Sequence, residues 1–162
     1  MRVLKRGSLL LMMGAALGFV LSGCGHLWTP PVPTVIFGPP MIQGERGEIV
    51  VSVADLPKGA GALGVTLGGI VYPTAKMADI EVEGVSGYVV LAQDFTGGQG
   101  GFVISTISSQ GVASGPIAKI TFRALEEIAP GELALDEDKI SLIDVDNAPV
   151  DFDLTQPAYY AR

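Results

Sequence analysis

Between residues 45 and 154 the sequence is a series of short β-rich runs separated by glycine, proline and acidic residues. In several runs apolar and polar residues alternate, as where Ile120, Phe122 and Ala124 interleave with Lys119, Thr121 and Arg123. A period of two is typical of a strand with one face on a core and the other in water. Outside the first two dozen residues, no window has the 3.6-residue amphipathic period of a helix. The chain is therefore predicted to be all-β.

Nine runs have this character: 48–53, 63–72, 79–82, 88–93, 102–107, 117–125, 132–135, 139–143 and 150–154. Short strands at this spacing, with turn residues between them, predict a single β-sandwich over residues 45–154. The spacing alone does not distinguish an immunoglobulin-like sandwich from a jelly roll. Residues 155–162 follow as a C-terminal tail.

The first 23 residues have the pattern of a signal peptide. Arg2, Lys5 and Arg6 precede an apolar run from Leu9 to Val20, which is shorter than the roughly 20 residues of a membrane-spanning helix. The run ends in Leu-Ser-Gly-Cys, and this segment resembles the bacterial lipobox. The resemblance implies that Cys24 is diacylated and becomes the mature N-terminus. An ordinary secretory signal followed by an incidental cysteine is the alternative.

Residues 24–44 are predicted to be the lipidated N-terminus and a proline-rich tether. The stretch TPPVPTVIFGPP at 29–40 favours extended polyproline II structure, which would span about 35 Å. Acyl chains hold a protein on a bilayer through their buried methylenes. We therefore expect an exported protein attached to a bacterial membrane, the outer membrane in a diderm host.

Four stretches of the domain resemble the cohesin family, whose modules bind dockerins in cellulosomes and also occur in other bacterial proteins. They read EIVVSVADLP, ALGVTLGGIVYPTAKMADIEVEG, GGFVISTISSQGVASGPIAKITFRAL and LALDEDKISLIDVDNAPVDF. The likeness covers roughly residues 45–154 and is strongest from Gly115 to Leu125 and in the last hairpin. It departs from the family where Tyr72 meets Pro73 without the aspartate often found between them.

The cohesin resemblance implies a jelly-roll β-sandwich of about eight to nine strands and a non-catalytic module that docks an envelope protein, such as a dockerin-like partner. Because the wider sandwich superfamily includes carbohydrate-binding modules, a polysaccharide ligand is the alternative. The predicted domain has no tryptophan, so Tyr72 and Tyr88 are the candidate ligand contacts.

Composition argues against several other functions. The chain has 10 Lys and Arg against 17 Asp and Glu, and without the leader the formal charge becomes −10, so nucleic-acid binding is not expected. The single histidine, His26, lies in the predicted tether, and Cys24 is assigned to lipid, which leaves no residues for Ser-His-Asp or Cys-His catalysis. We predict a protein that is not an enzyme and needs no cofactor.

Two local motifs have alternative interpretations. Asp144, Asp146 and Asn147 could supply oxygen ligands to calcium, although such residues also favour turns through side-chain-to-backbone hydrogen bonds. The glycine-rich run 96–101 superficially resembles a phosphate-binding loop, but it precedes a β-rich run and not a helix. It is therefore predicted to be a hairpin turn with positive φ angles.

Overall fold

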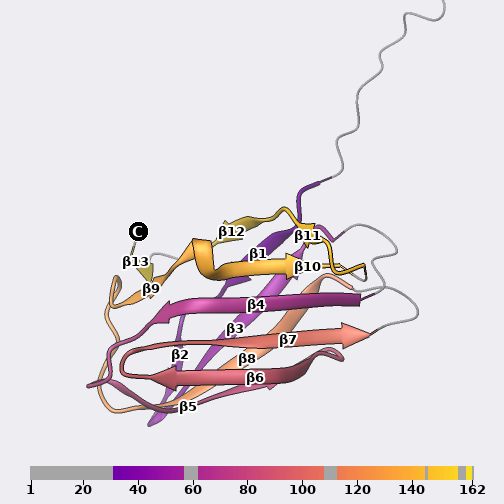
Figure 1. Cartoon of the computed structure of the whole chain (residues 1–162). Coiled ribbons are helices and arrows are strands. Elements are labelled where there is room, and N and C mark those ends of the chain that lie inside the picture. Colours follow the sequence, from indigo (N-terminus) through magenta and orange to yellow (C-terminus); the bar gives the residue numbers. More distant parts are fainter. Residues whose placement is uncertain (1–30, 57–61, 108–112, 145, 157–159, 162) are drawn as a thin grey trace, which may run out of the picture. The chain divides into compact units, whose positions relative to one another are not determined.

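The computed structural model describes residues 31–56, 62–107, 113–144, 146–156 and 160–161, which form a sandwich of two β-sheets (Figure 1). Sheet A has the order β12 (Asp153–Thr155), β1 (Thr34–Phe37), β3 (Arg46–Ala54), β8 (Gly115–Ala124) and β5 (Met77–Gly84), with β2 (Met41–Gln43) also paired to β3. Sheet B has the order β11 (Pro149–Val150), β10 (Ile140–Ile143), β4 (Ala62–Val71), β7 (Gln99–Ile107) and β6 (Val89–Thr96).

Short elements complete the fold. Strand β9 (Leu133–Leu135) pairs with β4, and β13 (Tyr160–Ala161) pairs in parallel with β9. The predicted C-terminal tail therefore contributes a strand. A 3₁₀ turn, η1 (Glu137–Lys139), precedes β10. Within the described residues, no helix reaches the length and apolarity needed to cross a membrane.

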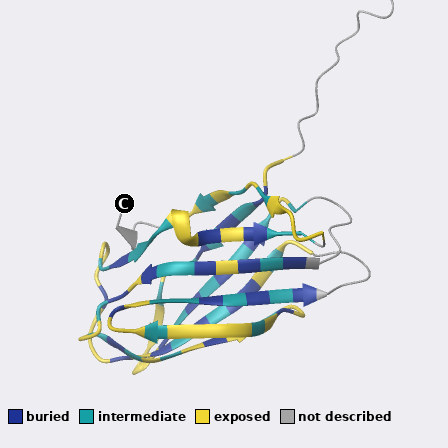
Figure 2. Ribbon diagram, viewed as in Figure 1, coloured by how far each residue is buried: buried dark blue, intermediate teal, exposed yellow. Residues whose placement is uncertain are grey.

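The period-two alternation produces the core, as predicted. Ile49, Val51 and Val53 of β3 are buried, and Ile49 lies opposite the buried Ile120 of β8. Figure 2 shows buried segments alternating with more exposed ones along the central strands of both sheets. Burying an aliphatic or aromatic side chain contributes about 1.5–3 kcal/mol. The alternation therefore stabilises both the sandwich and its register.

The all-β sandwich is confirmed, and each of the nine predicted runs overlaps at least one strand. The last run is divided between β11 and β12, because β11 pairs with β10 of sheet B whereas β12 pairs with β1 of sheet A. This division places the end of the chain at the edges of both sheets.

The N-terminal boundary differs from the sequence prediction. Residues 34–37, predicted as part of the proline-rich tether, form β1 between β12 and β3. Val35 and Phe37 are buried in the core, and the Pro33 carbonyl accepts a 2.8 Å hydrogen bond from the Asp153 N–H. The prolines on either side favoured the prediction of a tether, although the four residues between them are β-branched or aromatic and form a strand. The predicted signal peptide, Cys24 and the first part of the tether lie outside the described residues.

The glycine-rich run forms the predicted hairpin turn. Gly97 and Gly98 connect β6 to β7 with φ angles of 64° and 86°. Positive φ at both central positions is the requirement of the two-residue turn that matches strand twist. The Gly98 carbonyl also accepts a 2.9 Å hydrogen bond from the Tyr72 N–H, which joins the hairpin to the end of β4. The run therefore has a structural explanation that requires no phosphate.

Candidate functional site

The outer faces of the two sheets differ sharply in charge. On sheet A the outward positions of β3, β5 and β8 include several charged residues among uncharged ones such as Val50, Ser52 and Thr121. The charged residues are Arg46, Glu48, Glu81, Glu83, Lys119 and Arg123. Several of these charges are paired, with Lys119 Nζ 3.3 Å from Glu48 Oε2 and Arg123 Nε 2.7 Å from Asp79 Oδ2. Covering this face would require removing many hydrated charges from water, which is costly.

The outer face of sheet B is almost free of charge. We define it by the side chains that alternate with the buried ones on β4, β6, β7 and β10: Gly64, Thr66, Gly68, Val89, Ala92, Asp94, Thr96, Gln99, Gly101, Val103, Ser105, Ser141 and Ile143. Asp94 is the one ionisable side chain in this set. Small and uncharged residues make the face inexpensive to desolvate.

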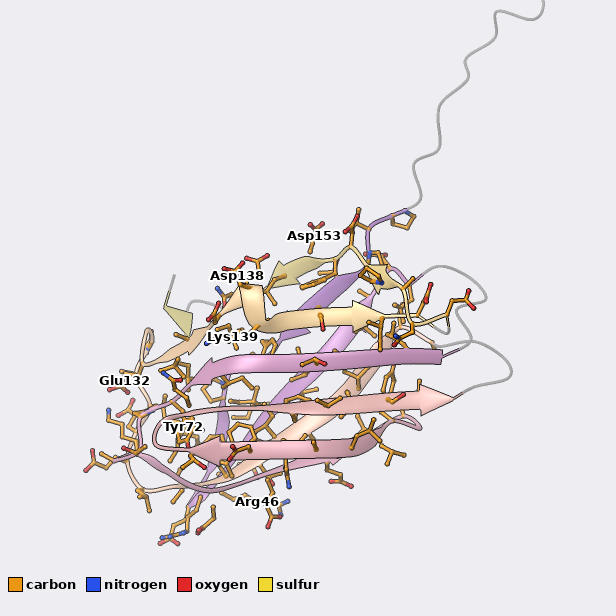
Figure 3. The ribbon with its side chains drawn as sticks, in the orientation of Figure 1. Arg46, Tyr72, Glu132, Asp138, Lys139 and Asp153 are labelled. Carbon is orange, nitrogen blue, oxygen red and sulfur yellow. The ribbon has the colours of Figure 1, made fainter. Side chains whose placement is uncertain are left out.

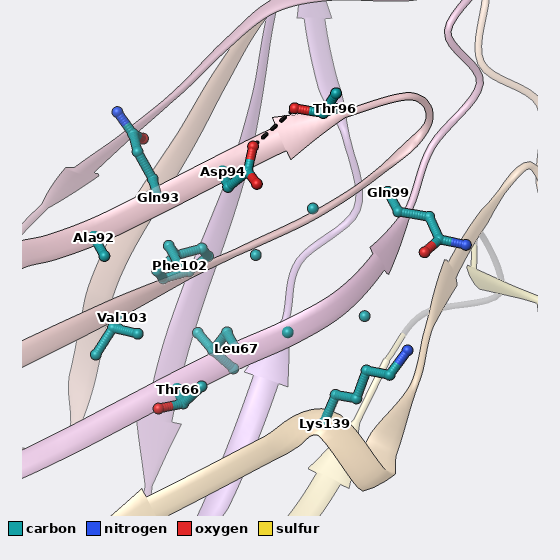
Figure 4. Close-up of a pocket in the computed structure, with 14 residues that line it drawn as sticks. Thr66, Leu67, Ala92, Gln93, Asp94, Thr96, Gln99, Phe102, Val103 and Lys139 are labelled. Carbon is teal, nitrogen blue, oxygen red and sulfur yellow. Dashed lines mark hydrogen bonds between the residues drawn. The ribbon is translucent and has the colours of Figure 1, made fainter.

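A groove of about 500 Å³ crosses the outer face of sheet B (Figure 4). It follows from glycines on the two central strands. Gly68 and Gly69 form a bulge in β4, where the register shifts and Gly69 has a φ of 66°. Across from them, a methyl group at Gly101 would come within 2.5 Å of the Leu67 carbonyl oxygen. The floor of the groove is therefore formed largely by backbone atoms, because these glycines have no side chains.

Charged residues stand on both sides of the groove. Figure 4 shows Asp94 on one side and Lys139 on the other. The Asp94 carboxylate accepts a 2.8 Å hydrogen bond from the Thr96 hydroxyl. Lys139 Nζ lies 3.1 Å from Asp136 Oδ2, so its charge has a local partner. Within the described residues Asp94 has no cationic partner.

Apolar side chains are exposed beside the groove. On β6, Val89 and Leu91 are 62% and 65% exposed, well above ordinary core residues. Val89 lies opposite Ser105, and the register of β6 shifts at Leu91. Exposed apolar groups next to an uncharged surface are typical of a protein contact.

The two tyrosines predicted as ligand contacts belong to the core, which corrects that expectation. Tyr72 is 8% exposed and its ring lies 6.1 Å from the Phe95 ring, at the end of the sandwich that carries the β6–β7 turn (Figure 3). Tyr88 is 5% exposed, and burial raises its pKa to about 12. Because each tyrosine falls on an inward-facing position, neither can act as an exposed platform for a sugar.

The acidic calcium candidates form a turn between β10 and β11. Asp144 Oδ1 accepts hydrogen bonds of 2.9 Å from the N–H groups of Asp146 and Ala148, and Asn147 has a φ of 60°. Across the described ranges, no group of three or more His, Cys, Asp or Glu residues is arranged to hold a metal ion. Turn formation accounts for this spacing, and calcium binding remains the alternative interpretation of these residues.

The groove and Asp94 were not predicted from the sequence. The available signal was the interruption of a β-rich run by Gly64, Gly68 and Gly69, since glycine weakens a strand unless a close approach requires it. Gly68 comes close to Gly101 and Gly64 comes close to Ile143 only after β4 has paired with β7 and β10, and these pairings are tertiary contacts.

Comparison with solved structures gives the family likeness of this sandwich. It resembles a non-cellulosomal cohesin from Archaeoglobus fulgidus with a TM-score of 0.51 and 20% identity over 77% of this chain and 87% of that one. The sixth cohesin of Acetivibrio cellulolyticus scaffoldin B, solved in complex with a Cel5 dockerin, has a TM-score of 0.56 and 15% identity. The match covers 77% of this chain and 95% of that one. A cohesin module from a Clostridium perfringens family 33 glycoside hydrolase has a TM-score of 0.53 and 9% identity. The match covers 76% of this chain and 99% of that one.

The domain has a cohesin-like fold. Neither family models nor curated protein sequences match the chain. The cohesin-like domain covers nearly the whole length of these modules, so the resemblance first seen in four sequence stretches extends through both sheets. At these identities the likeness establishes the fold, and the binding surface must be argued from this domain's own residues.

Proposed function

We propose that this protein is a non-catalytic docking module that binds a protein partner through the outer face of sheet B. The contrast between the two outer faces carries the proposal. Sheet A presents a charged, partly ion-paired surface, whereas sheet B presents small uncharged residues with exposed Val89 and Leu91 beside them. Depletion of charge at the centre of a surface is a mark of protein interfaces.

We further propose a dockerin-like protein as the partner. Two cohesins of similar fold were solved in complexes with dockerins, one from the scaffoldin B of Acetivibrio cellulolyticus and the other in the CaDoc0917–CaCohA2 complex. The groove of sheet B is lined by several glycines, which have no side chains, so a partner can approach the backbone closely. No cofactor enters this proposal.

The docking proposal can be tested with the mature protein in detergent and a panel of dockerin modules encoded in the host genome. We expect at least one dockerin to bind, and expect its binding to be lost when Val89→Asp and Leu91→Asp are combined. The matched control combines Met41→Asp and Leu125→Asp, which place the same two charges on exposed apolar residues outside sheet B. Failure of every dockerin to bind, or equal loss in the control, would contradict the proposal.

We also propose that the protein is exported and held on a bacterial membrane by lipid on Cys24, with the outer membrane as its site in a diderm host. The support is the basic start, the apolar run and the Leu-Ser-Gly-Cys sequence that follows it. A Cys24→Ala variant should leave the membrane fraction and should not incorporate labelled palmitate. The proposal is wrong if this variant still fractionates with membranes.

A further inference from the structure

Asp94 is unusual because of the surface in which it stands. It is exposed on β6, opposite Gly101 of β7, and it is the one ionisable side chain among the outward positions that define the outer face of sheet B. Its carboxylate accepts a hydrogen bond from the Thr96 hydroxyl. A hydroxyl orients the carboxylate but leaves its negative charge uncompensated.

The other charges around the groove do not neutralise Asp94. Lys139 lies across the groove and is paired with Asp136 at 3.1 Å. The arginine and lysine of sheet A that form ion pairs, Arg123 and Lys119, bond to Asp79 and Glu48 on the opposite side of the sandwich. Within the described part of the chain, Asp94 therefore forms no ion pair, and a charged, exposed carboxylate of this kind is stabilised by the surrounding water.

Covering the outer face of sheet B would remove that water. A carboxylate that is desolvated without a cation or strong donors is heavily penalised, whereas one that gains a charge-assisted hydrogen bond is not. A partner that seats on this face must therefore bring its own positive charge to Asp94. A partner that lacks such a charge is rejected by the same carboxylate, which is how a single charge confers specificity.

We propose that Asp94 is the specificity-determining residue of the docking face, and that the partner is a protein surface uncharged at its centre with one arginine or lysine placed against this carboxylate. The inference rests on the proposed docking function. Because Asp94 stands on one side of the groove, the pairing also fixes which way round the partner sits.

The test uses the mature protein in detergent and the dockerin module retained by the wild type in the docking experiment. We expect Asp94→Asn to weaken binding about tenfold or more, and Asp94→Lys to abolish it, since a like charge would then face the partner's cation. Glu83→Gln is the matched control, because it neutralises an exposed carboxylate on the outer face of sheet A and should leave affinity unchanged. Raising the salt concentration should slow association with the wild type more than with Asp94→Asn.

A charge exchange completes the test. Each arginine and lysine on the dockerin is changed to glutamate in turn, and one of these variants should bind Asp94→Lys better than it binds the wild type. If no dockerin binds the wild type, the docking proposal itself fails. If a dockerin binds the wild type and Asp94→Asn equally well, or if no exchange restores binding, docking stands and the role of Asp94 is overturned.

Discussion

At the scale of single residues, Tyr88 shows how burial can work against a side chain. Its ring is packed in the core, but its hydroxyl is buried without a hydrogen-bond partner. An unsatisfied buried hydroxyl carries a desolvation penalty that the ring's packing must offset. The sequence predicted Tyr88 as a contact for a ligand, but in the fold its ring packs in the core and its hydroxyl forms no hydrogen bond.

Replacing Tyr88 with phenylalanine should therefore stabilise the domain. We expect a gain of about 1 kcal/mol in the free energy of unfolding, measured by urea denaturation at neutral pH, because the ring stays and the unpaired hydroxyl is removed. Tyr72→Phe is the control, because its hydroxyl is not among the buried unpaired groups of the described residues. A loss of stability in Tyr88→Phe would show that the hydroxyl has a partner.

The same tyrosine gives a pH dependence. Burial raises the pKa of Tyr88 from 10.0 to about 12, so the folded state holds the proton more tightly than the unfolded state. This contribution to stability is fully present below pH 10 and is lost as the pH rises through 12. Denaturation curves between pH 9 and about 12 should show a decline in the wild type that is smaller in Tyr88→Phe.

Asp144 is the second residue whose role can be separated by experiment. Its carboxylate accepts hydrogen bonds from two backbone N–H groups, which stabilises the turn between β10 and β11. We expect Asp144→Ala to lower the free energy of unfolding by about 1 kcal/mol, and we expect calcium and chelator to leave the wild-type melting temperature unchanged. A calcium-dependent rise in melting temperature that Asp144→Ala abolishes would instead support the calcium interpretation.

At the scale of elements, strand periodicity was predictable and strand interruptions were not. The alternation around Phe122 set the inward face of β8 correctly, because each inward position is apolar regardless of its neighbours. The glycines of β4 had no such explanation within their own segment. Gly68 and Gly69 leave room for Gly101 of β7 and for Asp136 and Lys139 around η1, whereas Gly64 leaves room for Ile143 of β10.

The β6–β7 turn provides a test at this scale. Gly97 and Gly98 both have positive φ, and Asn tolerates this conformation better than residues with other side chains. We expect Gly97→Asn to be nearly neutral and Gly98→Ala to cost about 1–2 kcal/mol in the free energy of unfolding. A methyl group at Gly98 would also crowd the Tyr72 carbonyl oxygen at 3.2 Å. Equal stability of the two variants would argue against this turn geometry.

At the scale of the whole molecule, the sandwich includes more of the chain than the sequence suggested. Strand β1 lies between β12 and β3, so it joins the two ends of the domain in one sheet. The prolines of residues 29–40 lie before and after this strand, and none lies within it. A segment that looks like a tether by composition thus becomes part of the core.

Truncation tests this boundary. A chain that begins at residue 31 should unfold cooperatively, whereas one that begins at residue 45 loses β1, β2 and the buried side chains of Val35 and Phe37. Each of these two side chains stabilises the fold by about 1.5–3 kcal/mol, and β3 would keep an open edge. We expect the shorter chain to aggregate or to melt at a much lower temperature. Equal melting temperatures would restore the boundary at residue 45.

The sequence by itself determined the all-β class, the inward face of most strands and the hairpin at Gly97 and Gly98. These depend on local periodicity and turn chemistry, which each segment carries alone. The tertiary structure decided the burial of Tyr72 and Tyr88, the inclusion of residues 34–37, and the assembly of a groove with Asp94 and Lys139 on its two sides. Those properties arise when strands far apart in sequence become neighbours, because charge and exposure belong to a face and not to a segment.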